Sequence, residues 1–167
     1  MPTVADLVVR RLHGAGVRVL FGVPGGGSSL DLIEAARRLE LRFVLTATET
    51  AAAIAAIAHA ELTGTPGVCL TGLGPGVASV VNGAACAQLE RAPLLVITDA
   101  HPASADGAAH QRIDHRALLA PVVKWSAALT PSTADAVMAD AIARATAPPR
   151  GAVHLEIPSD VAGVHIA

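Results

Sequence analysis

The stretch Phe43–Gly76, FVLTATETAAAIAAIAHAELTGTPGVCLTGLGPG, decides the fold of this chain. It begins with the apolar run Phe43–Leu45, which predicts a buried strand. The polar segment Thr46–Glu49 follows and leads into a predicted helix. The first turns of that helix, Ala51–Ala58, carry no charged side chain, so we expect the helix to be largely buried. The Gly-Thr-Pro-Gly sequence of Gly64–Gly67 ends the helix, and Val68–Leu70 predicts the next strand. The stretch therefore predicts a strand–helix–strand unit of the kind that builds parallel sheets.

One carboxylate, Glu49, lies at the junction between the first strand and the helix. Because the helix that follows is uncharged, we expect Glu49 to face an alanine-rich surface, where burial raises the pKa of a carboxylate. A carboxylate with a raised pKa can relay a proton, so Glu49 is the leading candidate for a functional residue. The alternative is structural: Glu49 belongs to a Thr46-x-x-Glu49 capping box or simply stabilises the helix dipole.

Outward from this stretch, the chain keeps alternating helices and strands. We predict helices over Val4–Leu12, Ser28–Leu39, Val77–Arg91, Asp114–Leu119 and Ser132–Ala145, and strands over Val17–Val23, Pro93–Thr98, Val122–Trp125 and Ala152–Ile157. This rhythm predicts an α/β fold: a three-layer, doubly wound domain with a mostly parallel sheet and helices on both faces. A length of 167 residues suits one domain, residues 1–167.

Composition excludes several classes of protein. Apolar residues make up 52% and charged residues 16%, which is a globular composition. The net charge of -2, without a basic cluster, argues against nucleic-acid binding, and Gly and Pro breaks in the uncharged stretches argue against a membrane span. Cys69 and Cys86 lack metal-ligand spacing, so we expect free thiols and a reducing, cytoplasmic compartment. His110 and His115 lack a third ligand, so we expect ordinary loop and surface residues and no metal site.

Four segments follow predicted strands and should gather at one edge of the sheet. They are Pro24–Ser29, the Glu49 junction, Gly72–Gly76 and the long irregular segment Asp99–Asp114. In parallel sheets, ligands bind outside the carboxyl ends of the strands, which makes this edge the candidate site. The glycine-rich loop Pro24–Ser29 could bind an anion at a helix N-terminus. The sequence contains neither of the common phosphate-loop motifs and no nucleophile-elbow motif.

Several ordered motifs carry a family resemblance. They are Phe21–Gly26 (FGVPGG), the Glu49 junction, Gly64–Leu70 (GTPGVCL), Gly74–Gly76 (GPG), Ala92–Thr98 (APLLVIT), His110-Gln111 and Val153–Val161 (VHLEIPSDV). Over nearly its whole length the chain resembles the N-terminal, pyrimidine-binding domain of thiamine-diphosphate-dependent enzymes, in the group of acetolactate synthase and the 2-keto-acid decarboxylases.

The resemblance implies a role for each motif. The glutamate corresponding to Glu49 hydrogen-bonds N1′ of the cofactor's aminopyrimidine and assists removal of the thiazolium C2 proton, after which a 2-keto acid is decarboxylated or joined to an acceptor. The resemblance places the following residues around the pyrimidine: Pro24, Gly25, Gly26, Gly74, Pro75 and Ser79, which stands where the family has Asn. His110 and Gln111 correspond to the substrate side, although a solvated loop residue explains Gln111 equally well.

The resemblance also implies missing parts. Family members hold Mg²⁺ and the diphosphate with a G-D-G…N domain, and no G-D-G occurs in this sequence. We therefore expect the chain to be inactive alone, and to be either a fragment of a longer enzyme or a small subunit. A homodimer is expected through the helices that follow Glu49 and Gly76. The candidate contact residues are Ala56, Ile57, His59, Val80, Ala84 and Ala87.

Departures from the family leave the 2-keto acid and the acceptor open. Thr48 stands where many members have His, and Asp99-Ala100 replaces a Gly-Gln pair of the synthases. Two other functions remain: a non-catalytic regulatory or assembly module with the same fold, and a generic α/β anion-binding domain that uses Pro24–Ser29. The presence of Glu49 favours the enzyme over the first, and the missing phosphate motifs disfavour the second.

Overall fold

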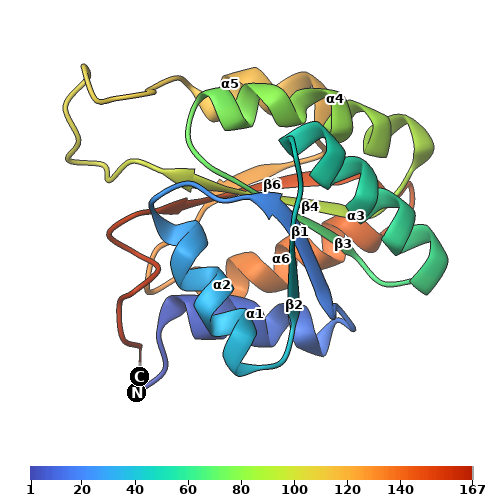
Figure 1. Ribbon diagram of the computed structural model, residues 1–167, viewed down its shortest axis with the longest axis horizontal. Helices are drawn as coiled ribbons and strands as arrows, with labels where there is room; N and C mark the ends of the chain where they lie inside the picture. Colours follow the sequence, from blue (N-terminus) through green and yellow to red (C-terminus); the bar gives the residue numbers. More distant parts are fainter. Residues whose placement is uncertain (167) are drawn as a thin grey trace.

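The computed structural model describes residues 1–166; Ala167, the last residue of the expected domain, lies outside them. A six-stranded sheet in the order β2-β1-β3-β4-β6-β5 forms the centre, and every neighbouring pair is parallel (Figure 1). The strands are β1 (Val19–Val23), β2 (Arg42–Leu45), β3 (Gly67–Thr71), β4 (Leu94–Ala100), β5 (Ser126–Ala128) and β6 (Ala152–Pro158).

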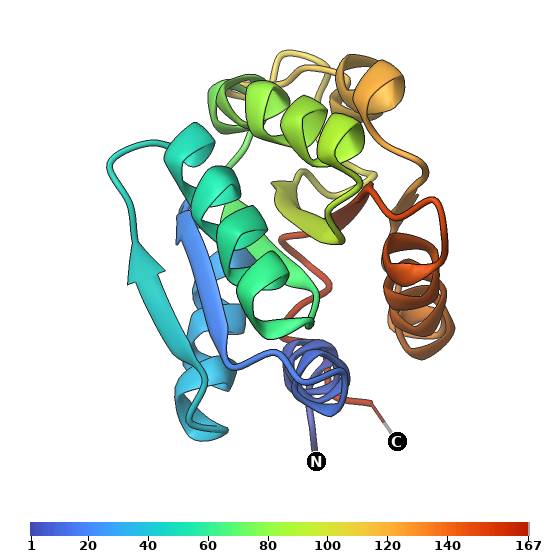
Figure 2. The same cartoon turned by 90° about the vertical axis from the view of Figure 1, so that its right-hand side faces the viewer.

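Helices cover both faces of the sheet. They are α1 (Val4–Gly14), α2 (Ser28–Arg38), α3 (Glu49–Thr63), α4 (Pro75–Glu90), α5 (His115–Leu119) and α6 (Ala134–Thr146), with a short 3₁₀ helix at Ala120–Val122. The helices α1, α2 and α6 lie on one face, and α3, α4 and α5 lie on the other (Figures 1 and 2). The predicted three-layer α/β architecture is confirmed, and its named strands are all parallel rather than mostly so.

Two of the predicted strands differ from the structure. The strand predicted at Val122–Trp125 lies instead at Ser126–Ala128, because the 3₁₀ helix Ala120–Val122 includes the first residue of the predicted segment. The predicted buried strand Phe43–Leu45 is the edge strand β2, and Leu45 is 68% exposed. The apolar run Phe43–Leu45 therefore predicted the strand correctly, but the strand is less buried than expected.

The two faces of the sheet have cores of different side chains. Toward α1, α2 and α6 the core is built largely from branched aliphatic residues, among them Val8, Leu12, Leu20, Leu32, Leu95 and Leu155. Toward α3 and α4, alanine dominates the helix surfaces, and the two helices approach closely. A Cβ added to Gly83 of α4 would lie 2.2 Å from the Cβ of Ala53 in α3, so this contact requires glycine.

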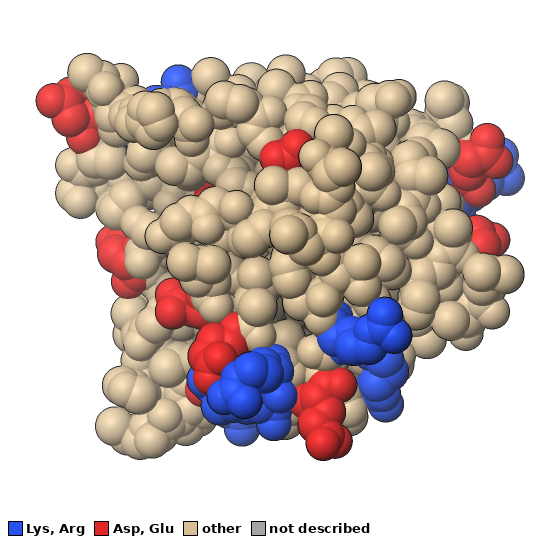
Figure 3. All heavy atoms as spheres, viewed as in Figure 1, with Lys and Arg blue, Asp and Glu red and all other residues tan. Residues whose placement is uncertain are grey.

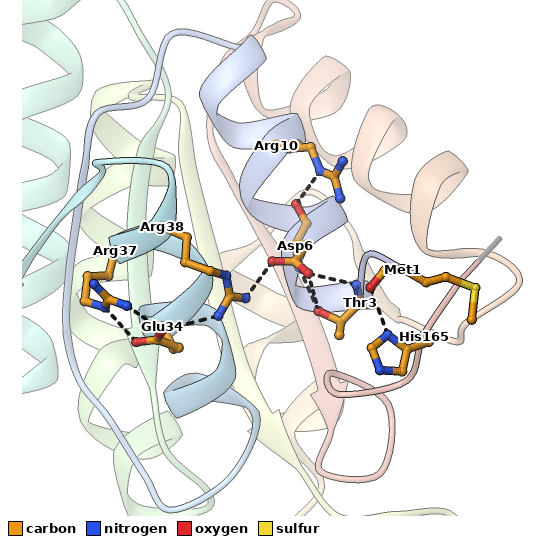
Figure 4. A network of polar contacts seen from close by, with 8 residues as sticks. All are labelled: Met1, Thr3, Asp6, Arg10, Glu34, Arg37, Arg38 and His165. Carbon is orange, nitrogen blue, oxygen red and sulfur yellow. Dashed lines mark hydrogen bonds and ion pairs between the residues drawn. The ribbon is translucent and has the colours of Figure 1, made fainter.

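A network of polar contacts lies on the outer surface of α1 and α2 (Figure 4). Thr3 and Asp6 form a capping box at the start of α1, and Arg38 of α2 donates to Asp6 Oδ1 at 2.6 Å. The bonds from Arg38 and from the Thr3 backbone lower the pKa of Asp6 to about 2. Arg37 and Arg38 also pair with Glu34. Figure 3 shows charged side chains gathered at the lower edge of the molecule, where α1 and α2 lie, below a largely uncharged surface.

The outer face of α3 is exposed, which corrects the expectation that this helix is largely buried. Ala52, Ala53, Ala56, Ile57 and Ala60 face the chain's own core. Along the opposite side, Ile54 is 42% and Leu62 is 87% exposed, because no other element of the described chain covers that side.

The dimer contacts expected on α3 and α4 are also largely wrong, because they were placed on the inward-facing sides of these helices. All but His59 of the six candidate residues are buried inside this chain, so they are not available to a second copy.

Candidate functional site

The glycine loops after β1 and β3 meet at the carboxyl edge of the sheet. A Cβ added to Gly25 would lie 3.0 Å from the Cα of Gly72 and 2.4 Å from Oδ2 of Asp99. No side chain fits at this contact, so Gly25 is required by the close approach of the backbones. Gly26, one residue on, has no atom within 4 Å of an added Cβ and borders open space. The edge therefore presents a bare backbone surface.

Glu49 is the first residue of α3 and lies half-buried against the start of α4. A Cβ added to Gly76 would lie 3.1 Å from Glu49 Oε1 and 2.6 Å from Oγ1 of Thr71. Gly76 thus lets the carboxylate sit beside the first turn of α4, where the helix dipole favours a negative charge. Within residues 1–166, the Glu49 side chain makes no hydrogen bond and no ion pair.

The capping-box explanation of Glu49 is wrong. The N-cap of α3 is Thr48, whose side chain accepts a bond from the Ala51 amide at 3.1 Å. Thr46 donates its hydroxyl to the carbonyl of Thr48 at 2.9 Å instead. Since another residue caps the helix, the Glu49 carboxylate remains available to a group outside the chain.

Asp99, at the end of β4, occupies the N-terminus of α2. Its Oδ1 accepts from the Ser29 amide at 2.6 Å and its Oδ2 from the Ser29 hydroxyl at 2.9 Å. Burial raises the pKa of Asp99, and the bonds from Ser29 and Gly27 oppose that rise. The chain's own carboxylate therefore sits where a bound anion would sit, which weighs against Pro24–Ser29 as an open anion site.

His115 is a buried residue and not the surface residue that we expected. It is 5% exposed, and its Nε2 accepts a bond from the Gly74 amide at 3.1 Å. Its Nδ1 lies 3.5 Å from Glu156 Oε1. Burial alone would raise the pKa of Glu156, but the contact with His115 and the bond and charge of Arg116 outweigh burial and lower it.

The loop that carries His110 and Gln111 packs against Gly74 through its backbone. A Cβ added to Gly74 would lie 2.2 Å from the Gln111 carbonyl oxygen, and Gly74 has a positive φ of +29°. The His110 carbonyl bonds to Nε2 of His101 at 2.9 Å. Both the His110 and Gln111 side chains are exposed. A cavity of about 610 Å³ lies behind this loop, lined in part by His101, His115 and Glu156.

The remaining predicted residues lie on α4. Pro75 is its first residue, and Ser79 lies one turn further along, where its carbonyl accepts a bond from the Thr50 hydroxyl of α3. Beneath Glu49, burial and then the Glu49 charge raise the pKa of the Cys69 thiol to about 12. Cys69 and Cys86 are both free, as predicted.

The described residues set further limits on the chemistry. Among residues 1–166, no group of three or more His, Cys, Asp or Glu side chains could hold a metal ion. None of the helices in that range combines the length and the hydrophobicity needed to cross a bilayer.

Sequence reasoning missed Asp99 and His115. Asp99 gives one usable signal, a carboxylate directly after an apolar strand. His115 gives none, because its partner Gly74 is 41 positions away.

Glu49, a carboxylate without a partner among residues 1–166, lies between glycine loops at the carboxyl edge of a parallel sheet, where α/β proteins bind their ligands. Similarity to known proteins identifies the family. The family model described as "Thiamine pyrophosphate enzyme, N-terminal TPP binding domain" matches residues 2–118. The chain belongs to the thiamine pyrophosphate enzymes, as a member of their N-terminal TPP-binding domain family.

Known proteins agree with this assignment. The chain is 36% identical over 170 residues to a probable 2-ketoarginine decarboxylase of Pseudomonas aeruginosa, covering 99% of this chain and 30% of that protein. It is 33% identical over 162 residues to the large subunit of acetolactate synthase isozyme 1 of Escherichia coli, covering 95% and 29%.

A solved structure shares the fold. It is a thiamine diphosphate-dependent 4-hydroxybenzoylformate decarboxylase of Rhodococcus jostii, with a TM-score of 0.90 and 22% identity over 99% of this chain and 32% of that chain. The chain therefore spans about a third or less of each of these proteins.

Proposed function

We propose that this chain is the pyrimidine-binding half of a thiamine-diphosphate-dependent enzyme that decarboxylates a 2-keto acid or joins it to an acceptor. The observation that carries the proposal is the Glu49 carboxylate, which is half-buried beside Gly76 and has no partner within residues 1–166. The names of the relatives support the substrate class, since 2-ketoarginine is itself a 2-keto acid.

The residues at the sheet edge fit an aminopyrimidine. A flat ring needs bare backbone for close approach, and Gly25, Gly26 and Gly76 supply positions without side chains. We propose that Pro24, Gly25, Gly26, Gly74, Pro75 and Ser79 line the ring, with Glu49 facing N1′. The partnerless carboxylate oxygens of Glu49 match the need of a ring nitrogen for one proton-exchanging neighbour.

Glu49 holds and returns a proton at N1′ in this proposal. When bound, thiamine diphosphate supplies the nucleophilic carbon and the electron sink. Thr48 fixes the start of α3, and Gly76 keeps side chains away from the carboxylate. The alanine surface of α3 and α4 excludes water, which strengthens the contact between the carboxylate and its partner. His110 and Gln111 are proposed to face the substrate.

The proposal requires partners. We propose that the whole chain, residues 1–167, acts as one pyrimidine-binding domain, and that a separate diphosphate-binding domain or subunit holds Mg²⁺. We also propose that two copies pair through the outer faces of α3 and α4, in a cytoplasmic enzyme. Ile54 and Leu89, exposed by 42% and 81%, replace the inward-facing residues first expected at that contact.

The test is release of carbon dioxide from a panel of 2-keto acids by the assembled enzyme. Glu49→Gln should lower the rate by roughly two to four orders of magnitude, because general acid–base assistance is lost. The matched control is Glu61→Gln, at the far end of the same helix, where Glu61 pairs with Arg150 at 3.3 Å. Equal rates for Glu49→Gln and wild type would contradict the proposal. A wild-type assembly that binds the cofactor but releases no carbon dioxide from any acid would favour the regulatory module.

A further inference from the structure

The contacts of His115 define its protonation state. The Gly74 amide donates to Nε2, and a ring nitrogen that accepts an N–H bond carries no proton. The proton of the neutral ring must then be on Nδ1, which faces Glu156 Oε1 at 3.5 Å. The side chain is 5% exposed, so both nitrogens are largely shielded from bulk water.

Glu156 is itself held in place from the other side. The Nε of Arg116 donates to Glu156 Oε2 at 2.8 Å, which leaves Oε1 directed at His115. The opposite charges of Arg116 and Glu156 compensate each other, so the arrangement does not require a charged imidazole. A chain of contacts thus runs from Arg116 through Glu156 and His115 to the backbone of Gly74.

Gly74 is the N-cap of α4, and among residues 1–166 no side chain caps this helix. Its φ of +29° is a conformation that other residues rarely adopt, and the Gln111 carbonyl leaves no room for a Cβ. Two residues later, Gly76 borders the Glu49 carboxylate. The bond to His115 therefore tethers the loop that determines how closely α4 approaches Glu49.

We propose that His115 is a positioning residue: its Nδ1–H tautomer, selected by Glu156, holds the Gly74 amide and thereby keeps Gly76 against Glu49. This inference deepens the proposed function, which makes Glu49 the working carboxylate. Its geometry involves only residues of this chain. The experiment therefore needs no bound cofactor.

The experiment is nuclear magnetic resonance on the isotope-labelled protein. Nitrogen shifts of the wild-type imidazole should report the Nδ1–H tautomer for His115. Amide exchange at Gly74 should accelerate about five- to tenfold or more in His115→Leu, as expected for a lost hydrogen bond. His115→Gln keeps an acceptor at similar reach and should restore most of the protection. His101→Leu alters another histidine of the same cavity and should leave Gly74 exchange within about threefold of wild type.

Three results would overturn the inference: an Nε2–H tautomer, unchanged Gly74 exchange in His115→Leu, or equal acceleration in His101→Leu. If His115→Leu does not fold, the wild-type tautomer and the His115→Gln exchange rate still decide the question. A failure here is distinct from a failure of the proposed function, which depends on Glu49→Gln.

Discussion

The two helical layers of this molecule end in different surfaces. On the layer of α1, α2 and α6, charged side chains pair with one another, as in Arg38 with Asp6 and Arg11 with Asp135. On the outer side of α3 and α4, apolar side chains such as Ile54 and Leu89 are exposed. Within residues 1–166, the ion pair of α3 involves Glu61 near its C-terminal end, and α4 has none. The outer surface of α1, α2 and α6 is therefore polar and suited to contact with water. The outer surface of α3 and α4 is apolar and suited to contact with another protein.

The side chains packed between the sheet and each helical layer also differ. Branched aliphatic side chains fill the space under α1, α2 and α6, where one residue can be replaced by another of similar volume. Alanine and glycine bring α3 and α4 together, so backbone lies near backbone at Gly83. The layer that carries Glu49 should therefore tolerate much less added volume than the other layer.

Substitution at Gly83 should give the largest loss of stability. A Cβ at this position would lie 2.2 Å from Ala53 Cβ, so Gly83→Val must separate α3 from α4. We expect a loss on the order of 4 kcal/mol in the free energy of unfolding, measured by chemical denaturation. The control is Gly14→Ala at the end of α1, where no atom lies within 4 Å of an added Cβ. Similar losses in both variants would remove the contrast between the layers.

Acid should destabilise the protein through His154, a fully buried residue of β6 beneath α4 and α5. Burial, opposed by the negative charge of Glu156 and aided by the positive charge of Arg116, lowers the pKa of His154 to about 4. Above pH 6.5 the ring is neutral in both states. Between pH 6.5 and 4 only the unfolded chain takes up the proton, so stability should fall by about 3 kcal/mol.

His154→Gln is the matched variant for this prediction. Glutamine can still bond to Thr98 and Ser126, the two partners of the ring, but it does not titrate. Denaturation curves at several pH values should show a flatter profile for the variant. An unchanged slope between pH 6.5 and 4 would assign the acid sensitivity to other groups.

Loss of Asp6, on the polar surface of α1 and α2, should have a smaller effect on stability. Asp6→Ala removes the capping box and the pair with Arg38, which together contribute about 1 to 2 kcal/mol at neutral pH. Because the folded pKa of Asp6 is lowered to about 2, this contribution is present above its ordinary value of 3.8 and lost as the pH falls toward 2. Urea midpoints at pH 7 and pH 2.5 measure the difference. Glu34→Gln, on the same surface, should shift the urea midpoint much less than Asp6→Ala does.

Substitution of Ile54 should change stability least and association most. Ile54→Asp adds a charge to a side chain that is 42% exposed, so the free energy of unfolding of the monomer should change by about 0.5 kcal/mol or less. If α3 and α4 form the contact between two copies, the variant should shift sedimentation toward monomer. Leu30→Asp, at a 51% exposed position of α2, is the control and should leave association unchanged. The same oligomeric state in wild type and Ile54→Asp would contradict the proposed interface.

The sequence predicted the features that local patterns determine. Apolar runs marked β1, β3, β4 and β6, and Glu49 was correctly placed at the start of α3. The strand β5 was misplaced, because Ser-Ala-Ala at Ser126–Ala128 carries no apolar pattern and is only half-buried. The exposure of Ile54 was missed, because an uncharged helix shows which residues are apolar but not which of its sides has a neighbour.

The roles of Asp99 and His115 could not be predicted from local pattern. Asp99 bonds to Ser29 across 70 positions, and His115 bonds to Gly74 across 41 positions. Each bond depends on the order in which parallel strands are placed side by side. That order follows from the folding of the whole chain, so residues that shape the loops around Glu49 emerge only from the assembled sheet.

The most direct test of the central claim is deuterium exchange at C2 of thiamine diphosphate in the assembled enzyme, which needs no knowledge of the 2-keto acid. Wild type should accelerate this exchange over the free cofactor, and Glu49→Gln should slow it by roughly two to four orders of magnitude while folding stays intact. The chain without a diphosphate-binding partner should give little acceleration. Exchange in assembled Glu49→Gln as fast as in wild type would show that the carboxylate at the start of α3 does not activate the cofactor.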